Sequence, residues 1–289
     1  MLSGLLTGGL LGLAAAGFTL LWRITGLLNL AQGAMILLGA YVAWFVAVPL
    51  GAGLVAAVLV AILCGLALGY VVQRFLLNLL VGGPSYLAVL AAYGVGLAID
   101  EALALLFTDN YRTIPSVLAD TDLALGPLRV LWADALALAV SVLGVVILGL
   151  VLTRTRLGLG LRAISMDRDA GRLIGLPAAT LFARAAALSG AAAAAAGSVI
   201  AIGSPFTATQ GNHLLVLVST AAVIGRLGNL WGAFAGGMAL GGLQSLVTLY
   251  APLQLTDVVA LLVLLGLLAI RPVRAPMMVR GRSQHQARG

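Results

Sequence analysis

Long apolar runs joined by short polar connections are the feature that most constrains this chain. A helix needs about 20 apolar residues to cross the hydrocarbon core of a bilayer, and runs of that kind fill most of the sequence. Only 9% of the 289 residues are charged, whereas a soluble domain carries about 25%. Disordered chains, coiled coils, disulfide scaffolds and soluble globular enzymes are thereby excluded. We expect an all-α polytopic membrane protein.

The apolar runs divide by length into about nine transmembrane segments, within a range of roughly eight to ten. We place them at about residues 2–22, 27–49, 53–73, 86–107, 132–152, 179–203, 213–225, 230–249 and 255–270. The seventh is shorter than a full span, which indicates a half-span or a re-entrant element. No basic stretch precedes the first segment, so we interpret it as a retained helix and not as a cleaved signal peptide.

The positions of the basic residues indicate the orientation. All 16 are arginine, and arginines collect on the cytoplasmic side of membrane helices. With the N-terminus outside and the C-terminus cytoplasmic, only Arg112 and Arg129 fall on the outer side. The excess charge of +7 therefore reflects membrane topology, and we expect no nucleic-acid partner. We predict one transmembrane domain over residues 1–271 and a basic cytoplasmic tail over 272–289 that is disordered or lies on anionic membrane lipid.

Several kinds of site are excluded by residues that the sequence lacks. A nucleotide-binding P-loop requires a lysine, and the chain has no lysine. Its single cysteine, Cys64, permits neither an internal disulfide nor a Cys-x-x-Cys metal site. With two histidines and no cluster of titratable groups at one depth, a membrane-embedded enzyme is disfavoured. We expect no catalytic residue, no metal and no cofactor bound by this chain.

The predicted cytoplasmic loop over residues 154–177 is the most informative connection. Apolar residues recur in it at helical spacing with charges between them. We predict a short amphipathic helix at about 166–174, with Ser165 as its N-cap and Gly175 and Pro177 ending it. On these grounds alone it either lies on the membrane surface or is presented to a cytoplasmic partner.

Polar residues inside the predicted spans are candidates for function, because they are costly at membrane depth. Asp100 and Glu101 point about 100° apart on a helix, so one can line a path while the other pairs within the bundle. Both can also be structural. Asn29 and Gln32 lie on one helix face with Gly33 beside them, as glue between helices or as part of an unwound path. Asn229 lies a few residues after Arg226 and before Leu230, in the same order as Asn29 lies after Arg23 and before Leu30.

Small residues recur at four-residue spacing and predict close helix packing. They include Gly4, Gly8, Gly12 and Ala16 near the N-terminus and Gly232, Gly236, Gly237, Gly241 and Gly242 near the C-terminus. These faces either pack together inside the chain or form a seam with a second subunit.

Three stretches resemble the permease subunits of branched-chain amino acid ABC importers. The first is Gly26-Leu-Leu-Asn-Leu-Ala-Gln-Gly-Ala-Met-Ile-Leu-Leu-Gly-Ala-Tyr41. The second is Ala163-Ile-Ser-Met-Asp-Arg-Asp-Ala-Gly-Arg-Leu-Ile-Gly-Leu176, and the third is Val223-Ile-Gly-Arg-Leu-Gly-Asn-Leu-Trp-Gly-Ala-Phe-Ala-Gly-Gly237. They follow the order of that family and extend over nearly the whole chain.

The resemblance implies a bundle like that of a type II ABC importer permease, in a bacterial inner membrane. It implies a second homologous permease subunit (in a heterodimer or a homodimer), two cytoplasmic ATP-binding subunits that use ATP and Mg, and an extracytoplasmic solute-binding protein. The loop would then be a coupling element that contacts the ATPase through Arg162, Ala163, Ser165, Asp167, Arg168, Asp169, Arg172, Leu173 and Gly175. The translocation path would include Asn29, Gln32, Gly33, Asp100, Glu101 and Asn229.

Two departures from the family pattern leave the solute open. Gln32 stands where the family commonly has His, and Ala34 stands where it commonly has Glu. The cargo is therefore a branched-chain amino acid or a related small solute such as urea or an amide. The alternative is an ion-coupled secondary transporter in which Asp100 and Glu101 are coupling sites, and composition alone is also compatible with a channel.

Overall fold

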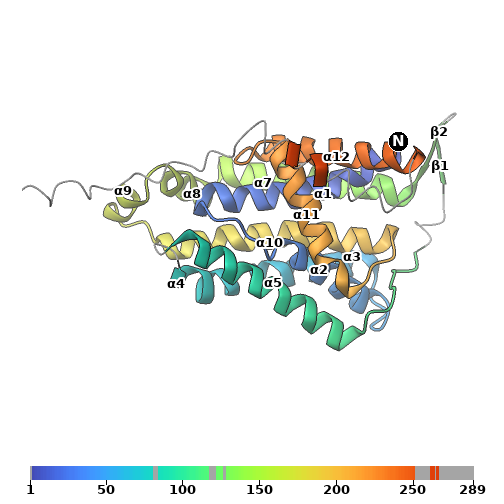
Figure 1. Cartoon of the computed structure of the whole chain (residues 1–289), viewed down its shortest axis with the longest axis horizontal. Helices are drawn as coiled ribbons and strands as arrows, with labels where there is room; N and C mark the ends of the chain where they lie inside the picture. Colours follow the sequence, from blue (N-terminus) through green and yellow to red (C-terminus); the bar gives the residue numbers. More distant parts are fainter. Residues whose placement is uncertain are drawn as a thin grey trace, which may run out of the picture.

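The fold is a bundle of apolar helices. The computed structural model describes residues 2–80, 84–116, 122–125, 128–250, 261–263 and 265–266. Eight apolar helices make up the bundle (Figure 1): α1 (Leu2–Thr25), α2 (Gln32–Ala47), α3 (Leu54–Val72), α5 (Ser85–Phe107), α7 (Trp132–Arg154), α10 (Ala178–Gly203), α11 (Gly211–Ile224) and α12 (Leu230–Tyr250). Short helical pieces lie between them: η1 (Gln73–Leu77), a π-helical turn, with α4 (Asn78–Leu80), α8 (Arg156–Met166), α9 (Arg168–Leu173) and η2 (Ala208–Gln210).

The helices match the first eight predicted segments in position. Six of them are long and apolar enough to cross a membrane. One of the six is α3, counted together with its continuation to Leu80. The other two, α2 and α11, are shorter, as predicted for the seventh segment but not for the second. The ninth segment and the tail over 272–289 lie outside the described residues, except for helical pieces at 261–263 and 265–266.

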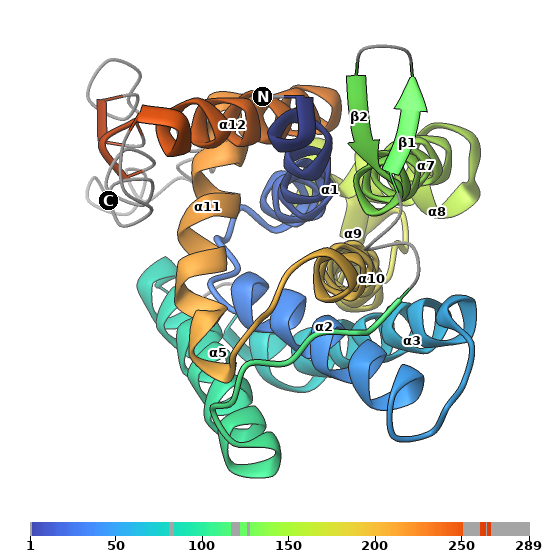
Figure 2. The same cartoon turned by 90° about the vertical axis from the view of Figure 1, so that its right-hand side faces the viewer.

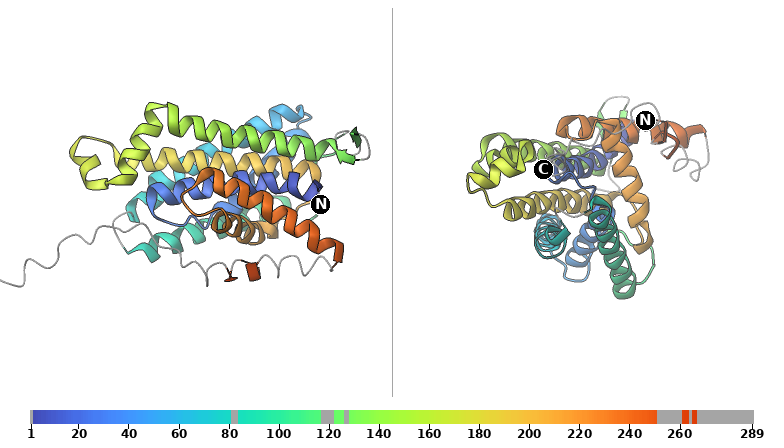
Figure 3. Two further views of the ribbon diagram at one scale, coloured as in Figure 1. Left: turned by 90° about the horizontal axis from the view of Figure 1, so that it is seen from above. Right: turned by 60° about the vertical axis from the view of Figure 1, so that its left-hand side comes forward.

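The two ends of the bundle carry different structures. Strands β1 (Asp122–Leu125) and β2 (Leu128–Leu131) pair antiparallel, with Asp122 opposite Leu131. This hairpin lies at the same end as the N-terminus, and α8 and α9 lie at the opposite end (Figures 1 and 3). The connection between the predicted segments at 86–107 and 132–152 therefore contains strands, which an all-α expectation did not include.

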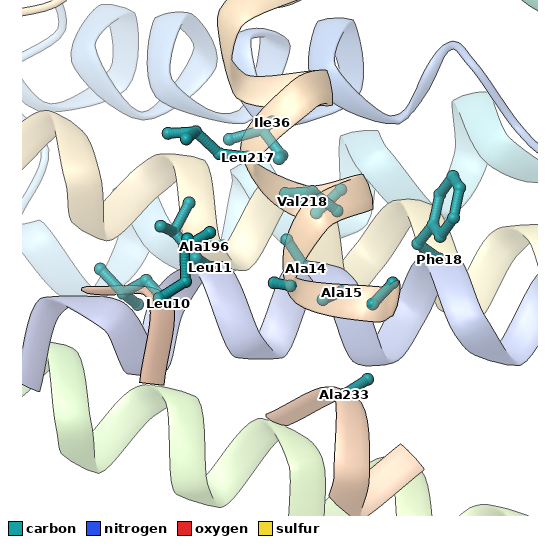
Figure 4. Packing of buried hydrophobic residues seen from close by; sticks show 14 of the residues in the cluster. Leu10, Leu11, Ala14, Ala15, Phe18, Ile36, Ala196, Leu217, Val218 and Ala233 are labelled. Atoms are coloured by element: carbon teal, nitrogen blue, oxygen red, sulfur yellow. The ribbon is translucent and has the colours of Figure 1, made fainter. Parts of the chain in front are cut away.

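The core forms around α1 and α10. Most residues of these two helices are buried, whereas only a minority of the residues of α3, α5, α7 and α12 are buried. Apolar side chains that remain exposed on these outer helices suit contact with lipid. Figure 4 shows the centre of the core, where residues of α1 such as Ala14 and Phe18 meet Leu217 and Val218 of α11.

The predicted small-residue faces pack against each other inside the chain. The glycines of α1 lie along α12, and a Cβ atom on Gly237 would lie 2.2 Å from the Cα of Gly12. Backbones approach this closely only where side chains are absent. The interpretation of these glycines as internal packing is therefore confirmed for α1 and α12.

Helix α11 crosses the bundle instead of running along it. Figure 2, which looks along the long axis, shows α11 extending from the side of α5 to the side of α12. It packs on α2, α1 and α12. The residues at its N-terminal end are thereby placed against α2 and α5.

Candidate functional site

The end of the bundle away from the N-terminus carries a pair of short helices, α8 and α9. The hydroxyl of Thr155 accepts a hydrogen bond from the backbone N–H of Gly158 at 3.1 Å and so caps α8. Asp167 interrupts the helical path with extended backbone, and its carboxylate accepts from the N–H of Ala170 at 3.0 Å to begin α9. The predicted short helix at about 166–174 is present as α9 (Arg168–Leu173). Its predicted cap is wrong, since Ser165 lies inside α8 and its hydroxyl donates to the carbonyl of Arg162.

The inner face of α8 fastens this pair to the bundle. Leu161 and Ile164 are fully buried in a cluster with residues of α1, α7 and α10. The guanidinium of Arg168 donates to the carbonyl of Thr25, the last residue of α1, and lies 5.3 Å from the ring centre of Phe182 in α10. These contacts connect the joint between α8 and α9 to the two helices that form the core.

The outer face of the pair is apolar and exposed. Met166, Leu173 and Ile174 expose 88%, 88% and 75% of their surface. Gly175, with a φ of +83°, then turns the chain through the left-handed region that glycine tolerates. Exposed apolar side chains on a projecting element indicate a surface that contacts another protein or the membrane.

The remaining residues of the predicted coupling set lie along the same pair. Arg162 is exposed on α8 and Ala163 is partly buried. Asp169 and Arg172 fall within α9, and their side chains lie outside what the structure describes. The structure thus brings the predicted coupling residues together on one projecting element.

Gln32, predicted for the path, lies in the centre of the bundle. Its amide donates to the carbonyls of Ala14 and Ser189, and its oxygen accepts from the hydroxyl of Ser189 at 3.1 Å. Asn29 is also buried, and its oxygen accepts from the backbone N–H of Ala31 just before α2 begins. These bonds connect α2 to α1 and α10 and fix how α2 starts.

Gly33 and Asp100 converge on one point, the first residue of α11. A Cβ atom on Gly33 would lie 2.1 Å from the carbonyl oxygen of Gly211, and one on Gly211 would lie 2.2 Å from Oδ2 of Asp100. The other carboxylate oxygen, Oδ1, is buried without a hydrogen-bond partner in the described residues. Three helices, α2, α5 and α11, meet here with a carboxylate between them.

The structure does not bring the other two predicted path residues to this point. Glu101 is exposed on α5. Asn229 is exposed before the start of α12, where it lines a small cavity with Arg23 and Arg162. The predicted path residues therefore lie in different places. Asn29 and Gln32 are in the centre of the bundle, Gly33 and Asp100 meet at Gly211, and Asn229 lies near α8.

A polar cavity of about 590 Å³ opens between α1, α7, α10 and α12 near the N-terminus. Its wall includes Asp134, which is 6% exposed and accepts a hydrogen bond of 2.5 Å from the hydroxyl of Ser3. Gln244, Ser245 and Thr248 of α12 line the opposite side. Sequence reasoning missed Asp134, although an acidic residue close to the beginning of an apolar segment was a usable signal.

Comparison with known proteins decides the family. A family model described as the permease component of the branched-chain amino acid transport system matches residues 1–268. The chain belongs to this family. The resemblance of the three sequence stretches is thereby confirmed. As a member of the branched-chain amino acid permease family, the protein is a multi-pass transport subunit of the inner membrane and not a catalytic enzyme.

Individual members of the family align with almost the full chain. The high-affinity branched-chain amino acid transport system permease protein BraD of Pseudomonas aeruginosa is 28% identical over 94% of this chain and 93% of its own length. The permease protein LivH of Escherichia coli K12 is 25% identical over 94% and 92%. A probable LivH of Methanocaldococcus jannaschii is 26% identical over 91% and 87%.

Proposed function

We propose that this chain is the transmembrane subunit of an ATP-driven ABC importer that moves branched-chain amino acids into the cytoplasm. The observation that carries the proposal is the α8–α9 pair, which presents Met166, Leu173 and Ile174 to solvent while Leu161 and Ile164 hold it to the core. An element that is exposed on one side and fastened to α1 and α10 on the other suits the transmission of motion from a cytoplasmic partner. The family of the chain supports the same role.

The proposed assembly contains a second permease subunit, two cytoplasmic ATP-binding subunits and an extracytoplasmic solute-binding protein. The N-terminus, the β hairpin and the cavity beside Asp134 would face outside, and α8 and α9 would face the cytoplasm. This orientation is supported by the arginines, since those of the α8–α9 segment cluster at one end of the bundle. ATP and Mg would bind to the partner ATPases.

The mechanism would be alternating access. Closure of the ATPases on ATP would displace the α8–α9 pair, and the part-buried contacts of Arg168 with Thr25 and Phe182 would transfer that displacement to α1 and α10. Because α11 crosses the bundle and rests on Asp100 through Gly211, a shift of the core would change the contact between α2, α5 and α11. Gly33 and Asp100 are the path residues that this geometry favours.

The solute is proposed from the family alone. The relatives are described as branched-chain amino acid permeases, whereas urea and amides remain alternatives because Gln32 and Ala34 depart from the family pattern. Gln32 forms its hydrogen bonds with residues inside the bundle, which suits a role in helix assembly.

The test is ATP-dependent uptake of leucine into vesicles that contain the chain with its co-expressed second permease subunit, ATP-binding subunits and solute-binding protein. The double variant Leu173→Ser/Ile174→Ser is expected to lose both the co-purification of the ATPase and uptake. The matched control is Leu79→Ser in α4, because Leu79 is 80% exposed and lies outside the α8–α9 pair. Uptake by the chain alone under a proton or sodium gradient would establish the secondary transporter instead.

A further inference from the structure

A cavity of about 180 Å³ lies between α1, α7, α8 and the start of α12. It is separate from the polar cavity beside Asp134, which opens at the other end of the bundle. Six polar residues line it: Thr19, Arg23, Thr153, Arg162, Ser165 and Asn229. The rest of its wall is apolar and comes from Leu20, Ile24, Leu152, Leu161, Leu230 and Trp231, with two glycines.

The deep end of the cavity contains an unsatisfied polar atom. Thr19 is 1% exposed, and its hydroxyl oxygen has no hydrogen-bond partner in the described residues. A buried hydroxyl usually finds a partner, because leaving it unpaired costs about 1–3 kcal/mol. In a helix, that partner is often the carbonyl one turn earlier, as it is for Thr25 with Leu21. Thr19 lines the cavity, and a ligand group that reached its enclosed hydroxyl would supply the missing hydrogen bond.

The mouth of the cavity is cationic. Arg23 lies four residues after Thr19 and thus on the same face of α1, and Arg162 and Ser165 share a face of α8 in the same way. Both arginines are exposed, and Arg23 is steadied by a 3.2 Å hydrogen bond to the carbonyl of Gly228, which also lines the cavity. No acidic residue is among the described residues of the wall. An anionic group is favoured at this end.

We propose that this cavity binds a small carboxylate with a compact apolar body. The guanidinium groups of Arg23 and Arg162 would hold the carboxylate, since Arg–carboxylate hydrogen bonds are among the strongest available to a protein. The hydroxyl of Thr19 would pair with a polar atom of the ligand, and the leucines and Trp231 would surround its apolar part. An apolar cavity of about 150 Å³ accommodates benzene, so about 180 Å³ suits a short branched chain.

The position gives binding a consequence for α8. The ligand would contact α1, α7, α8 and α12 at once and so strengthen the attachment of the α8–α9 pair to the bundle. A carboxylate bound from the α8 side of the bundle would therefore oppose displacement of the α8–α9 pair. Binding itself does not depend on ATP-driven transport, so its failure and the failure of the proposed function are distinguishable.

The test is isothermal titration of the purified full-length chain in neutral detergent with 4-methylpentanoate, the matched alcohol 4-methylpentan-1-ol, and inorganic phosphate. We expect binding of the carboxylate alone. In Arg162→Gln, the affinity is expected to fall by about tenfold or more, the loss that follows removal of one charge-assisted hydrogen bond. The matched control is Arg184→Gln, an exposed arginine of α10 away from the cavity, which is expected to bind as wild type.

A second variant separates ligand binding from a structural role. Thr19→Val removes the unpaired hydroxyl while it preserves shape, so the thermal midpoint of the ligand-free chain is expected to stay or rise while carboxylate affinity falls. A lower midpoint with unchanged affinity would show that Thr19 is structural and would overturn the assignment. The proposal would also be overturned if the alcohol bound as tightly as the carboxylate, or if no probe bound. It would be overturned as well if phosphate bound as tightly as the carboxylate, which is the result expected of a lipid headgroup site.

Discussion

The hydroxyl of Ser189 donates to the side-chain oxygen of Gln32 at 3.1 Å in the centre of the bundle. Both residues have no exposed surface, and the amide of Gln32 donates in turn to the backbone of α1 and α10. A fully bonded polar group in an apolar interior fixes the relative position of its helices. Gln32 and Ser189 thus set the register of α2 against the core.

We predict that Gln32→Leu destabilises the chain by about 1–3 kcal/mol, because the hydroxyl of Ser189 loses its acceptor in the buried interior. The measurement is chemical unfolding in detergent of Gln32→Leu, Ser189→Ala and the double variant. The double variant is expected to be more stable than the sum of the single effects implies, with a coupling energy near 1 kcal/mol. Strict additivity would contradict a direct bond.

The pair also shows where sequence reasoning stops. The polarity of Gln32 inside an apolar segment identifies it as a candidate, but its partner lies 157 positions away and looks like any serine in a small-residue helix. The choice between helix glue and path therefore depends on tertiary contacts. The same holds for Asp100, whose neighbour Gly211 carries no side chain that a pattern could identify.

The seam between α1 and α12 gives the second prediction. Gly237→Ala is expected to destabilise the chain by about 2 kcal/mol or more, because the new Cβ would lie 2.2 Å from the backbone of Gly12 and the helices must separate. Gly94→Ala in α5 is the matched control, since nothing lies within 4 Å of its Cβ position. That change is expected to be neutral or stabilising by about 0.5–1 kcal/mol. The measurement is the thermal midpoint, and equal midpoints for the two variants would refute the seam.

Arg168 provides the third prediction, on the attachment of the α8–α9 pair. Arg168→Ala removes the hydrogen bond to the carbonyl of Thr25 and the contact with Phe182, and we expect faster proteolysis between α8 and α9 with little change in global unfolding. Phe182→Leu removes the cation–π contact, which contributes about 0.5–1 kcal/mol, and also changes core packing because Phe182 is 1% exposed. We therefore expect it to lower global stability, which Arg168→Ala leaves nearly unchanged. Unchanged cleavage in Arg168→Ala would show that this contact does not hold the pair.

The order of the first eight helices follows from the sequence because bilayer thickness sets the length of an apolar segment, whereas α2 is shorter than its predicted segment at 27–49. The α8–α9 segment differs. Its break is set by the extended backbone of Asp167. Thr155 supplies the cap of α8, ten residues before the predicted cap Ser165. Several Ser, Thr and Asp residues of the α8–α9 segment can cap a helix. Which of them does so depends on which helix face is buried, here the face of Leu161 and Ile164.

Asp134 gives the fourth prediction. Asp134→Ala is expected to destabilise the outer ends of α1 and α7, because the hydroxyl of Ser3 loses a charge-assisted hydrogen bond of about 1.5–3 kcal/mol. Ser3→Ala is expected to cost less, since the carboxylate remains in contact with a polar cavity of about 590 Å³. Hydrogen exchange at residues near the N-terminus measures the effect. An equal response to both substitutions would contradict a solvated carboxylate.

Orientation in the membrane gives the last prediction, because the bundle has two unlike ends. We expect the end with the N-terminus and the β hairpin to face outside, since the arginines of the α8–α9 segment lie at the other end. In a Cys64→Ala background, Asn110→Cys, exposed after α5, should react with a membrane-impermeant maleimide in intact spheroplasts. Leu173→Cys, exposed by 88%, should react only after the membrane is opened. The reverse pattern would invert the topology and place the α8–α9 pair on the wrong side for an ATPase.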